Sequence, residues 1–381
     1  MTRPLSIAIL GTRGVPPRYG GFETFAAELG TRLAARGHRV TVYCRSYLYP
    51  DRPSSWNGVD LVHLPAIEQK YLETVSHAAL SAAHLILGRD QRSTINDQRP
   101  DVVLLCNAAN AFVVPLLRAA RIPVATNVDG IERKRKKWNA LGKLVYLTGE
   151  ALAAHFSPRV VADATTIARY YRDAFDVRAE TIAYGSEFPD ETDTAVLAGL
   201  GVAPGAYVLY VSRFEPENHP LEVAEAFLRA RTEVPLVMVG SAPYSSELIR
   251  RLEAVAQRSN GRILLPGALY GADYRTLQRN ARLYIQATEV GGTHPALIEA
   301  MGSNGVVLAL DTAENREVGG DSIRYFRFDG RDSLESVLSG TLLADPGDYR
   351  ARARTRARAQ YAWESVTNAY ERLFREIAGA A

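Results

Sequence analysis

The chain has 381 residues, more than one ordinary hydrophobic core holds, so two domains are expected. A hydrophobic fraction of 47% and a charged fraction of 23% are typical of a folded globular protein and exclude disordered and fibrous classes. The formal net charge of +3 is too small to indicate nucleic-acid binding, so any basic function must be local.

The two cysteines, Cys44 and Cys106, each end an apolar strand-like run, which favours small buried side chains over a disulfide or a zinc site. The longest apolar runs are strand-sized and far short of the roughly 20 residues of a membrane span. Met1–Leu5 leads directly into a strand pattern without the cleavage region of a signal peptide. A cytoplasmic protein is therefore expected.

The N-terminal half alternates strand-like and helix-like segments, which predicts a doubly wound parallel sheet. Apolar residues at helical spacing predict a helix over Phe22–Arg36, ended by Gly37. Further helices are expected near Leu72–Leu87, Ala111–Ala120 and Leu141–Phe156. Strands are expected at Ser6–Leu10, Arg39–Cys44, Val59–Leu64, Asp101–Cys106, Pro123–Asn127 and Arg159–Asp163.

A polar, acidic stretch, Ser186–Asp193, contains a proline and is typical of a linker between domains. The alternation then restarts, which predicts a second Rossmann-like domain with helices near Leu221–Ala230 and Ser245–Arg258. Its strands are expected at Tyr207–Val211, Leu236–Val239, Arg262–Leu265, Arg282–Gln286, Val306–Leu310 and Ile323–Phe326. Two helices are expected over Tyr349–Ile377.

The loop after the first strand brings Gly20 and Gly21 to the start of the first helix, at the sheet edge where open α/β folds bind ligands. It is a poor dinucleotide fingerprint, because it lacks Gly-x-Gly-x-x-Gly and the second strand ends in Cys44-Arg45 rather than in an acidic ribose ligand. The two glycines could also serve only to turn the chain.

The stretch Gly291–Met301 carries the strongest ligand-binding pattern. It follows a predicted strand, and Gly291 and Gly292 lead into a helix with Thr293 as the expected N-cap and a proline in the first turn. Exposed N–H groups at such a helix start favour a phosphate or another anion. Glu299 follows about a turn and a half later, where it could accept hydrogen bonds from a sugar hydroxyl. The alternative is an ordinary apolar helix after a glycine turn.

Arg213 follows the first strand of the second domain, and its planar, permanently charged fork suits phosphate oxygens. The alternative is a surface arginine paired with Glu215 or Glu217. The sequence contains no Asp-x-Asp and no His, Cys and Asp cluster with metal-ligand spacing. We therefore predict metal-independent chemistry, in which Arg213 and helix N-termini meet the charge that develops on a leaving diphosphate.

Six stretches, taken in order, resemble a retaining glycosyltransferase of family 4 with the GT-B fold, over nearly the whole chain. They are Gly11–Gly14, Tyr19–Thr24, Asn127–Glu132, Ala183–Gly185, Arg213–Asn218 and Gly291–Thr293. The resemblance implies two Rossmann-like doubly wound domains that face an inter-domain cleft. Residues 1–186, joined by a helix at 360–381, would bind the acceptor, and residues 187–359 the nucleotide-sugar donor.

The resemblance sharpens toward a bacterial subgroup similar to the β-1,4-rhamnosyltransferases of capsule and cell-wall polysaccharide assembly. The donor-binding residues that it implies are Arg213, Asn218, Gly291, Gly292, Thr293 and Glu299. The acceptor-side loop that it implies consists of Tyr19, Gly20, Gly21 and Glu23.

Three positions depart from the wider family. The wider family has two glutamates eight positions apart; Glu299 matches the second, but Gly291 stands at the first. Asn218 stands where the family has a lysine that clamps the diphosphate. Asp129 stands where the family has a histidine near the reaction centre. These departures are usual in the subgroup and indicate a variant active site, although a non-catalytic descendant is an alternative. His294 stands where the subgroup has asparagine.

Asp129 and Glu299 are the predicted catalytic residues. Asp129 lies just beyond the strand Pro123–Asn127, at the carboxyl edge of the first sheet, and Gly130 is expected to let the backbone turn there. Its carboxylate could take the proton of a sugar hydroxyl, position it, or stabilise positive charge on the sugar ring. The alternative is an aspartate that caps a turn through its own backbone.

One dense basic run ends in an aromatic residue: Arg133, Lys134, Arg135, Lys136, Lys137 and Trp138. Such runs are often only solvated faces. A transferase working on a lipid-linked acceptor must reach an anionic leaflet, where each basic residue contributes on the order of 1 kcal/mol. We therefore favour peripheral contact with the inner face of the plasma membrane.

The leading hypothesis is a transferase that moves L-rhamnose with retention from dTDP-L-rhamnose to a GlcNAc-headed undecaprenyl diphosphate acceptor, with no cofactor and no nucleic-acid partner. The sugar and the acceptor come wholly from the resemblance. Two alternatives stay open: a nicotinamide-dependent oxidoreductase, since Rossmann-like domains also bind dinucleotides, and a catalytically silent nucleotide-sugar binder.

Overall fold

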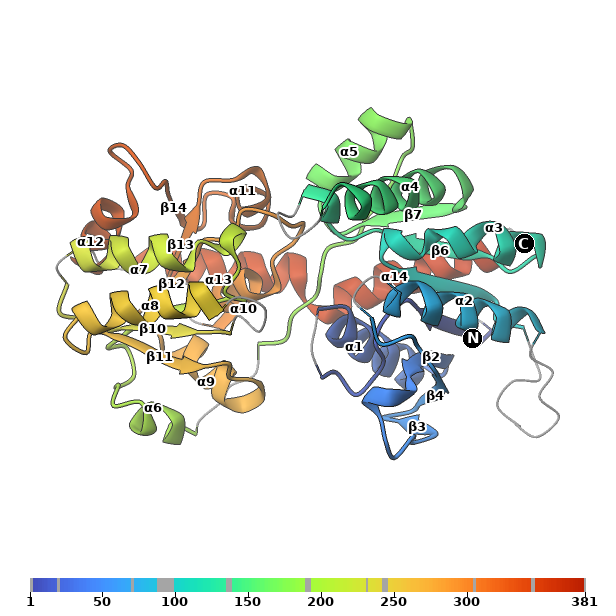
Figure 1. Ribbon diagram of the computed structural model, residues 1–381, viewed down its shortest axis with the longest axis horizontal. Helices are drawn as coiled ribbons and strands as arrows, with labels where there is room; N and C mark the ends of the chain where they lie inside the picture. Colours follow the sequence, from blue (N-terminus) through green and yellow to red (C-terminus); the bar gives the residue numbers. More distant parts are fainter. Residues whose placement is uncertain are drawn as a thin grey trace. The chain divides into compact units, whose positions relative to one another are not determined.

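A computed structural model of the chain shows two compact α/β units (Figure 1). The residues it describes are 3–18, 21–69, 72–87, 99–134, 139–188, 193–230, 232–241, 246–303, 306–343 and 347–379. Unit 1 consists of Met1–Gly185 together with Trp363–Ala381, and unit 2 is Ser186–Ala362. The sequence had placed the two boundaries at 186/187 and 359/360.

Unit 1 is built on an eight-stranded sheet with the order β3-β4-β2-β1-β5-β6-β7-β8. Its strands are β1 Ser6–Leu10, β2 Arg39–Arg45, β3 Ser55–Trp56, β4 Val59–Leu64, β5 Val102–Cys106, β6 Val124–Asn127, β7 Arg159–Ala162 and β8 Glu180–Thr181. The pairings are parallel except that of β3 with β4. The chain order reverses between β1 and β5, and such a switch point is where open α/β sheets bind ligands.

Helices cover both faces of this sheet. They are α1 Gly21–Ala35, α2 Glu73–Leu87, α3 Val114–Ala119, α4 Ala140–Phe156, α5 Thr165–Phe175 and α14 Trp363–Gly379, with 3-10 turns η1 Ser46–Leu48, η2 Ala108–Val113 and η3 Glu132–Lys134. Alternate residues of β1 point into two cores: Ile7 and Ile9 pack with α1 and α14, whereas Ala8 and Leu10 pack with the opposite helices. This alternation follows from the period of two in a strand.

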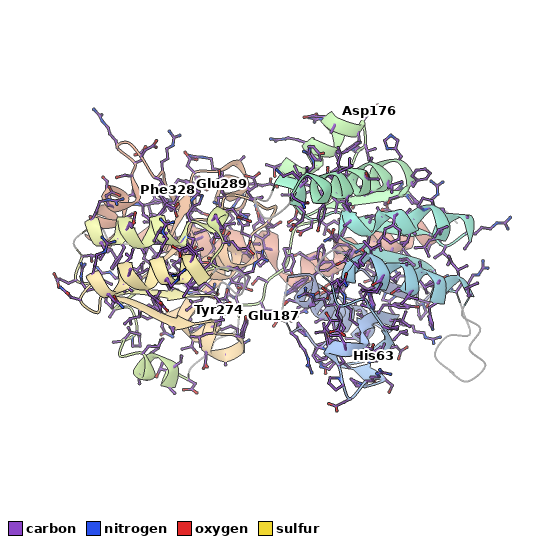
Figure 2. All side chains as sticks on the ribbon, in the orientation of Figure 1. His63, Asp176, Glu187, Tyr274, Glu289 and Phe328 are labelled. Carbon is purple, nitrogen blue, oxygen red and sulfur yellow. The ribbon has the colours of Figure 1, made fainter. Side chains whose placement is uncertain are left out.

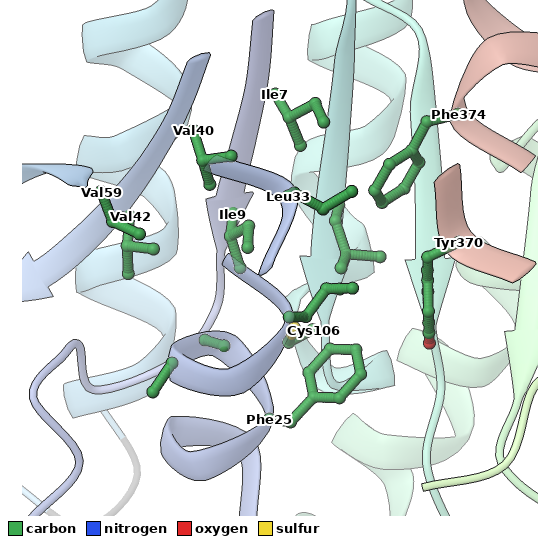
Figure 3. Close-up of a cluster of buried hydrophobic side chains, with 14 of the residues drawn as sticks. Ile7, Ile9, Phe25, Leu33, Val40, Val42, Val59, Cys106, Tyr370 and Phe374 are labelled. Carbon is green, nitrogen blue, oxygen red and sulfur yellow. The ribbon is translucent and has the colours of Figure 1, made fainter. Parts of the chain in front are cut away.

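The last helix of the chain, α14, belongs to unit 1. Figure 3 shows Tyr370 and Phe374 in the same core as Phe25, and the Tyr370 and Phe25 ring centroids are 5.3 Å apart. The Tyr370 hydroxyl also accepts a 2.8 Å hydrogen bond from the Asn127 side chain. The end of the chain therefore supports β6, the strand that precedes Asp129.

Unit 2 has a six-stranded parallel sheet with the order β11-β10-β9-β12-β13-β14. Its strands are β9 Val208–Val211, β10 Leu236–Val239, β11 Ile263–Gly267, β12 Leu283–Gln286, β13 Val307–Leu310 and β14 Arg324–Phe326. Its helices are α6 Ala195–Gly199, α7 Pro220–Arg229, α8 Ser246–Arg258, α9 Gly271–Asn280, α10 Pro295–Ser303, α11 Ala313–Gly319, α12 Leu334–Leu343 and α13 Gly347–Tyr361, with the 3-10 turn η4 Pro216–Asn218. Here the chain order reverses between β9 and β12.

One predicted helix takes a different form. The segment expected as a helix over Ala111–Ala120 is the 3-10 turn η2 followed by the short helix α3. Asn107 begins η2 with a φ of 74° and accepts a hydrogen bond from the Ala109 N–H, while a proline stands in the first turn of α3. Each of these features begins a new helical turn, so the segment forms two short helical pieces instead of one helix.

Candidate functional site

In unit 2, the loops after β9 and β12 meet at the switch point of the sheet. The loop after β9 contains Arg213, and the loop after β12 contains Gly291 and Gly292. The Glu289 N–H donates a 2.9 Å hydrogen bond to the Glu217 carbonyl and so joins the two loops. The predicted donor-binding segments are therefore neighbours at one end of the sheet, although they lie about 80 residues apart in the sequence.

Arg213 presents its guanidinium at the surface. Its side chain is 46% exposed, and its Nη1 lies 3.6 Å from the Glu215 Oε1. The two side chains thus form the ion pair that was the alternative to phosphate binding, at a distance too long for a hydrogen bond. Its backbone is held more firmly, because its carbonyl accepts hydrogen bonds from the Ser212 hydroxyl at 2.9 Å and the Asn218 amide at 2.6 Å. A fixed backbone with an exposed cationic head suits the capture of an anion.

Asn218 is buried, and its amide donates to the Arg213 carbonyl. Its own carbonyl accepts a 2.6 Å hydrogen bond from the Tyr210 hydroxyl. Asn218 was predicted as a donor-binding residue. In the structure its side-chain amide holds the backbone of Arg213, a contact that the sequence pattern does not indicate.

The helix α10 begins at Pro295, one residue later than expected. The His294 carbonyl accepts hydrogen bonds from the N–H groups of Leu297 at 3.0 Å and Ile298 at 3.2 Å, which makes His294 the N-cap residue. The expectation that Thr293 is the N-cap is therefore wrong. Pro295 takes the first helical position because its fixed φ suits the helix and it has no N–H to leave unpaired.

Glu299 lies on α10, where Tyr274 of α9 donates its hydroxyl to the carboxylate Oε2. The Gln278 amide donates to the Tyr274 oxygen at 2.7 Å and to the Ala296 carbonyl at 3.1 Å. Burial, followed by the charge of Glu299, raises the pKa of Tyr274 well above its usual value, so this phenol stays protonated. Neither Tyr274 nor the helix α9 that carries it was predicted from the sequence.

In unit 1, Asp129 follows β6 with a φ of +52°. Its N–H donates a 2.9 Å hydrogen bond to the Asn127 side chain. The turn expected at Gly130 is thus made by Asp129 itself, in a left-handed conformation that aspartate tolerates better than most residues. Asn127 supplies a cap for this turn, and the Asp129 side chain is partly exposed at the carboxyl edge of the sheet.

Glu23 and Asp129 lie close to the end of β5. Burial, followed by the negative charges of Glu23 and Asp129, raises the pKa of the Cys106 thiol well above its usual value. Glu23 is buried in the first turn of α1 and accepts a 2.8 Å hydrogen bond from the Arg13 N–H. It therefore fixes the loop after β1, which is a structural task within the predicted acceptor side.

The rest of the predicted acceptor loop is only partly described. Gly21 begins α1, and its carbonyl accepts a hydrogen bond from the Tyr184 hydroxyl. Tyr19 and Gly20 lie outside the described residues.

The basic run is described only at its start. The Arg133 Nε lies 3.1 Å from the Glu150 Oε2, and its Nη2 donates to the Tyr170 hydroxyl at 2.8 Å. Glu150 is buried, so Arg133 uses its charge within unit 1. The Lys134 side chain and residues Arg135, Lys136, Lys137 and Trp138 lie outside what the structure describes.

Two kinds of feature are missing from the described part of the chain. It holds no group of three or more His, Cys, Asp or Glu side chains placed to bind a metal ion. Within the same residues, no helix has the length and apolar character required to cross a bilayer.

Comparison with known proteins identifies the fold. Residues 20–185 match the family model of the glycosyl transferase 4-like domain, and no curated protein sequence matches the chain. Sucrose-phosphate synthase from Thermosynechococcus elongatus is similar in structure, with a TM-score of 0.79 at 18% identity over 98% of this chain and 99% of that one.

Two nucleotide complexes are also similar in structure. Anabaena HepE in complex with UDP has a TM-score of 0.74 at 15% identity over 98% of this chain and 100% of that one. The catalytic domain of Arabidopsis thaliana starch synthase IV, bound to ADP and acarbose, has a TM-score of 0.77 at 14% identity over 99% and 100%. The predicted GT-B fold is confirmed, and residues 20–185 of unit 1 are similar to the glycosyl transferase 4-like domain.

Proposed function

We propose that this chain is a retaining glycosyltransferase whose unit 2 binds a nucleotide-sugar donor and whose unit 1 binds the acceptor. One observation carries the proposal: Arg213 and the start of α10 belong to loops that are joined by a backbone hydrogen bond at the switch point of the unit 2 sheet. The family match of residues 20–185 and the nucleotides bound by the fold relatives support it.

The donor half of the reaction follows from charge. When the bond between the anomeric carbon and the diphosphate oxygen breaks, the electron pair leaves with the diphosphate, which becomes more negative. Arg213 and the α10 N-terminus would stabilise this charge without reorganising. Glu299, held by Tyr274, would present its carboxylate as an acceptor to hydroxyls of the donor.

The acceptor half requires a sugar hydroxyl to bond to the anomeric carbon and to lose its proton. Asp129 is our candidate for orienting this hydroxyl or receiving its proton, because its carboxylate is partly exposed at the carboxyl edge of the unit 1 sheet. The direct donor ligands that we propose are Arg213, Gly291, Gly292, Thr293 and Glu299, with Asn218 acting through Arg213.

The finer assignment rests on the resemblance to the rhamnosyltransferase-like subgroup. It names dTDP-L-rhamnose as the donor, a GlcNAc-headed undecaprenyl diphosphate as the acceptor, and bacterial polysaccharide synthesis as the setting. Metal-independent transfer is part of the same proposal, with cationic and backbone groups in the place of a metal.

Exposed apolar residues of α4 support the proposal of peripheral membrane association. Directly after the basic run, the outward side of this helix exposes Leu144, Val145 and Leu147, next to Lys143. Exposed apolar side chains with adjacent cations are typical of surfaces that contact anionic lipid.

A ligand panel tests the donor proposal. The melting temperature of the purified protein would be measured with dTDP, UDP, GDP, ADP and NADP, since a ligand at 100 times its Kd adds about 2.7 kcal/mol of stability. At least one nucleoside diphosphate should raise the melting temperature by several degrees. Stabilisation by NADP alone would instead favour an oxidoreductase.

A further inference from the structure

A buried polar pair lies beside the glycine loop of unit 2. The His294 Nδ1 lies 2.9 Å from the Asn315 Oδ1, and both side chains are buried. Asn315 stands at the start of α11, where its N–H donates to the Thr312 hydroxyl at 3.1 Å. The pair thus connects the N-cap residue of α10 to the first turn of α11.

The surroundings of Asn315 fix the proton position on His294. The Asn315 amide nitrogen donates to two carbonyls, that of Thr288 at 3.2 Å and that of Leu310 at 3.0 Å. Carbonyls only accept, so the orientation of the amide is determined and its oxygen faces His294. Because that oxygen can only accept, His294 must donate from Nδ1, which fixes the orientation of the ring.

The other edge of the His294 ring lies against Gly291. A Cβ atom at Gly291 would lie 2.6 Å from the His294 Nε2, a distance that real Cβ atoms essentially never show, and 3.0 Å from its Cδ2. Gly291 does not have a left-handed φ, so its backbone conformation does not require glycine. Space is therefore the reason for glycine here: a side chain at 291 and the ring at 294 would occupy the same volume.

The network reaches several loops at the carboxyl end of the sheet. Through its amide, Asn315 holds the Thr288 carbonyl in the loop after β12 and the Leu310 carbonyl at the end of β13. Through its oxygen it orients His294, which contacts Gly291. Buried hydrogen bonds of this kind favour one backbone arrangement, because removing either partner leaves a buried polar group without that bond.

We propose that His294 is a positioning residue for the donor diphosphate. Its ring, oriented by Asn315, holds the backbone of Gly291–Thr293 in the conformation that receives the phosphates, and Gly291 is glycine because the ring needs its space. The inference rests on the donor site proposed above. It implies that residues 291 and 294 are coupled, so a substitution at one position changes how strongly a substitution at the other affects donor binding.

A double-mutant cycle tests this coupling. The variants are Gly291→Ala, His294→Asn and the double variant, with affinity for the best nucleoside diphosphate measured by calorimetry at 10 °C. Gly291→Ala should weaken binding about tenfold or more, since its Cβ must displace the ring or the loop. When His294→Asn has already replaced the ring by a smaller side chain, adding Gly291→Ala should cost less than about threefold, so the two effects are not additive.

Controls separate a positioning role from a general loss of stability. Gly340→Ala changes a glycine of α12 whose Cβ would meet nothing within 4 Å, and it should bind nucleotide as the native chain does. Circular dichroism at 10 °C should show every variant folded, so that a loss of affinity reports the loop. In turnover, Gly291→Ala should raise the KM for the donor more than the KM for the acceptor.

Two results would overturn the inference: additive effects in the double variant, or native affinity in Gly291→Ala. Failure of the proposed function has a different signature, in which the native chain binds no nucleoside diphosphate. In that case the same cycle is scored by melting temperature. If Gly291→Ala lowers the melting temperature and adding His294→Asn does not restore it, the steric coupling is refuted.

Discussion

Substitution of Arg213 gives the clearest test of the proposed donor site. If its guanidinium stabilises the leaving diphosphate, Arg213→Ala should lower kcat/KM by roughly 100- to 1000-fold, the cost of removing one charge-stabilising donor. The matched control is Arg229→Ala, because Arg229 is also a half-exposed arginine of unit 2 and pairs with Glu335 far from the sheet end. Steady-state kinetics on both variants decides the point, and equal kcat/KM values in the two would reject the role of Arg213.

Substitution of Asp129 gives the corresponding test in unit 1. Asp129→Asn removes the charge but keeps the size of the side chain and its tolerance of the left-handed backbone. We expect kcat to fall at least 100-fold while donor affinity is unchanged, because general-base groups contribute about that much.

The control for this substitution is Asp176→Asn. Asp176 has the same left-handed conformation, with a φ of 55°, at the end of α5 (Figure 2). This variant should leave kcat unchanged. A stable Asp129→Asn protein with native kcat would return Asp129 to a purely structural role.

The ends of strands could be predicted from the sequence better than the contacts that individual side chains make. Arg213 and Glu299 were predicted as site residues because residues just past parallel strands and near helix starts gather at one edge of a sheet. Asn218, Tyr274 and Asn315 act through contacts with residues that are distant in the sequence or hidden behind the loop. Such contacts depend on packing, which no spacing pattern records.

Among the elements, α14 is held to unit 1 by an ionic cluster around Glu371. Burial alone would raise the pKa of this carboxyl, but hydrogen bonds from Arg375, Arg36 and His38 outweigh it and lower the pKa to about 2. The folded pKa lies below the ordinary value of 4.5, so the stabilisation is complete above pH 4.5 and is lost as the pH falls toward 2.

Glu371→Gln should therefore destabilise the protein by about 1–2 kcal/mol at pH 7, a value reduced for partial solvent screening because the side chain is 20% exposed. The difference in the free energy of unfolding between variant and native chain should shrink as the pH falls from 4.5 to 2. Urea unfolding at a series of pH values measures this difference. Glu364→Gln is the control, since Glu364 also pairs with Arg36 but is 73% exposed. An equal effect of the two substitutions would contradict the role assigned to Glu371.

The elements that the sequence predicted are those with a strong apolar period. The strand ranges Ser6–Leu10, Val59–Leu64 and Leu236–Val239 match β1, β4 and β10 residue for residue. The helix α9 was missed because Leu277 is its one large apolar residue that is buried, and its other buried side chains are Thr276 and Gln278. A helix with so narrow an apolar stripe is defined by its neighbours rather than by its own pattern.

For the whole molecule, membrane association is the property most open to test. Vesicles with anionic lipid should sediment the native chain, and binding should fall as salt rises, because exposed charges are screened beyond about 8–10 Å at physiological ionic strength. Leu144→Gln combined with Leu147→Gln should reduce binding further. Leu87→Gln, at an exposed leucine on the end of α2, is the matched control. Binding that neither salt nor the double substitution changes would reject this surface.

The two-unit architecture was predictable, because alternating strands and helices interrupted by an acidic, proline-containing stretch leave few other arrangements. The identities of the donor base, the sugar and the acceptor are a different matter. They depend on a few contacts at the sheet ends, and chains of one fold serve many substrates.

Sugar transfer by the native chain decides whether the protein is a glycosyltransferase. The native chain would be incubated with dTDP-L-rhamnose, UDP-glucose and ADP-glucose, each with a GlcNAc-headed undecaprenyl diphosphate acceptor, and both the released nucleoside diphosphate and the glycosylated lipid would be quantified. We expect one donor, dTDP-L-rhamnose in the finer proposal, to yield the two products in equal amounts, and Arg213→Ala and Asp129→Asn to abolish nearly all of this yield. A native chain that binds a nucleoside diphosphate but transfers no sugar from any donor would contradict it and leave a nucleotide-sugar binder.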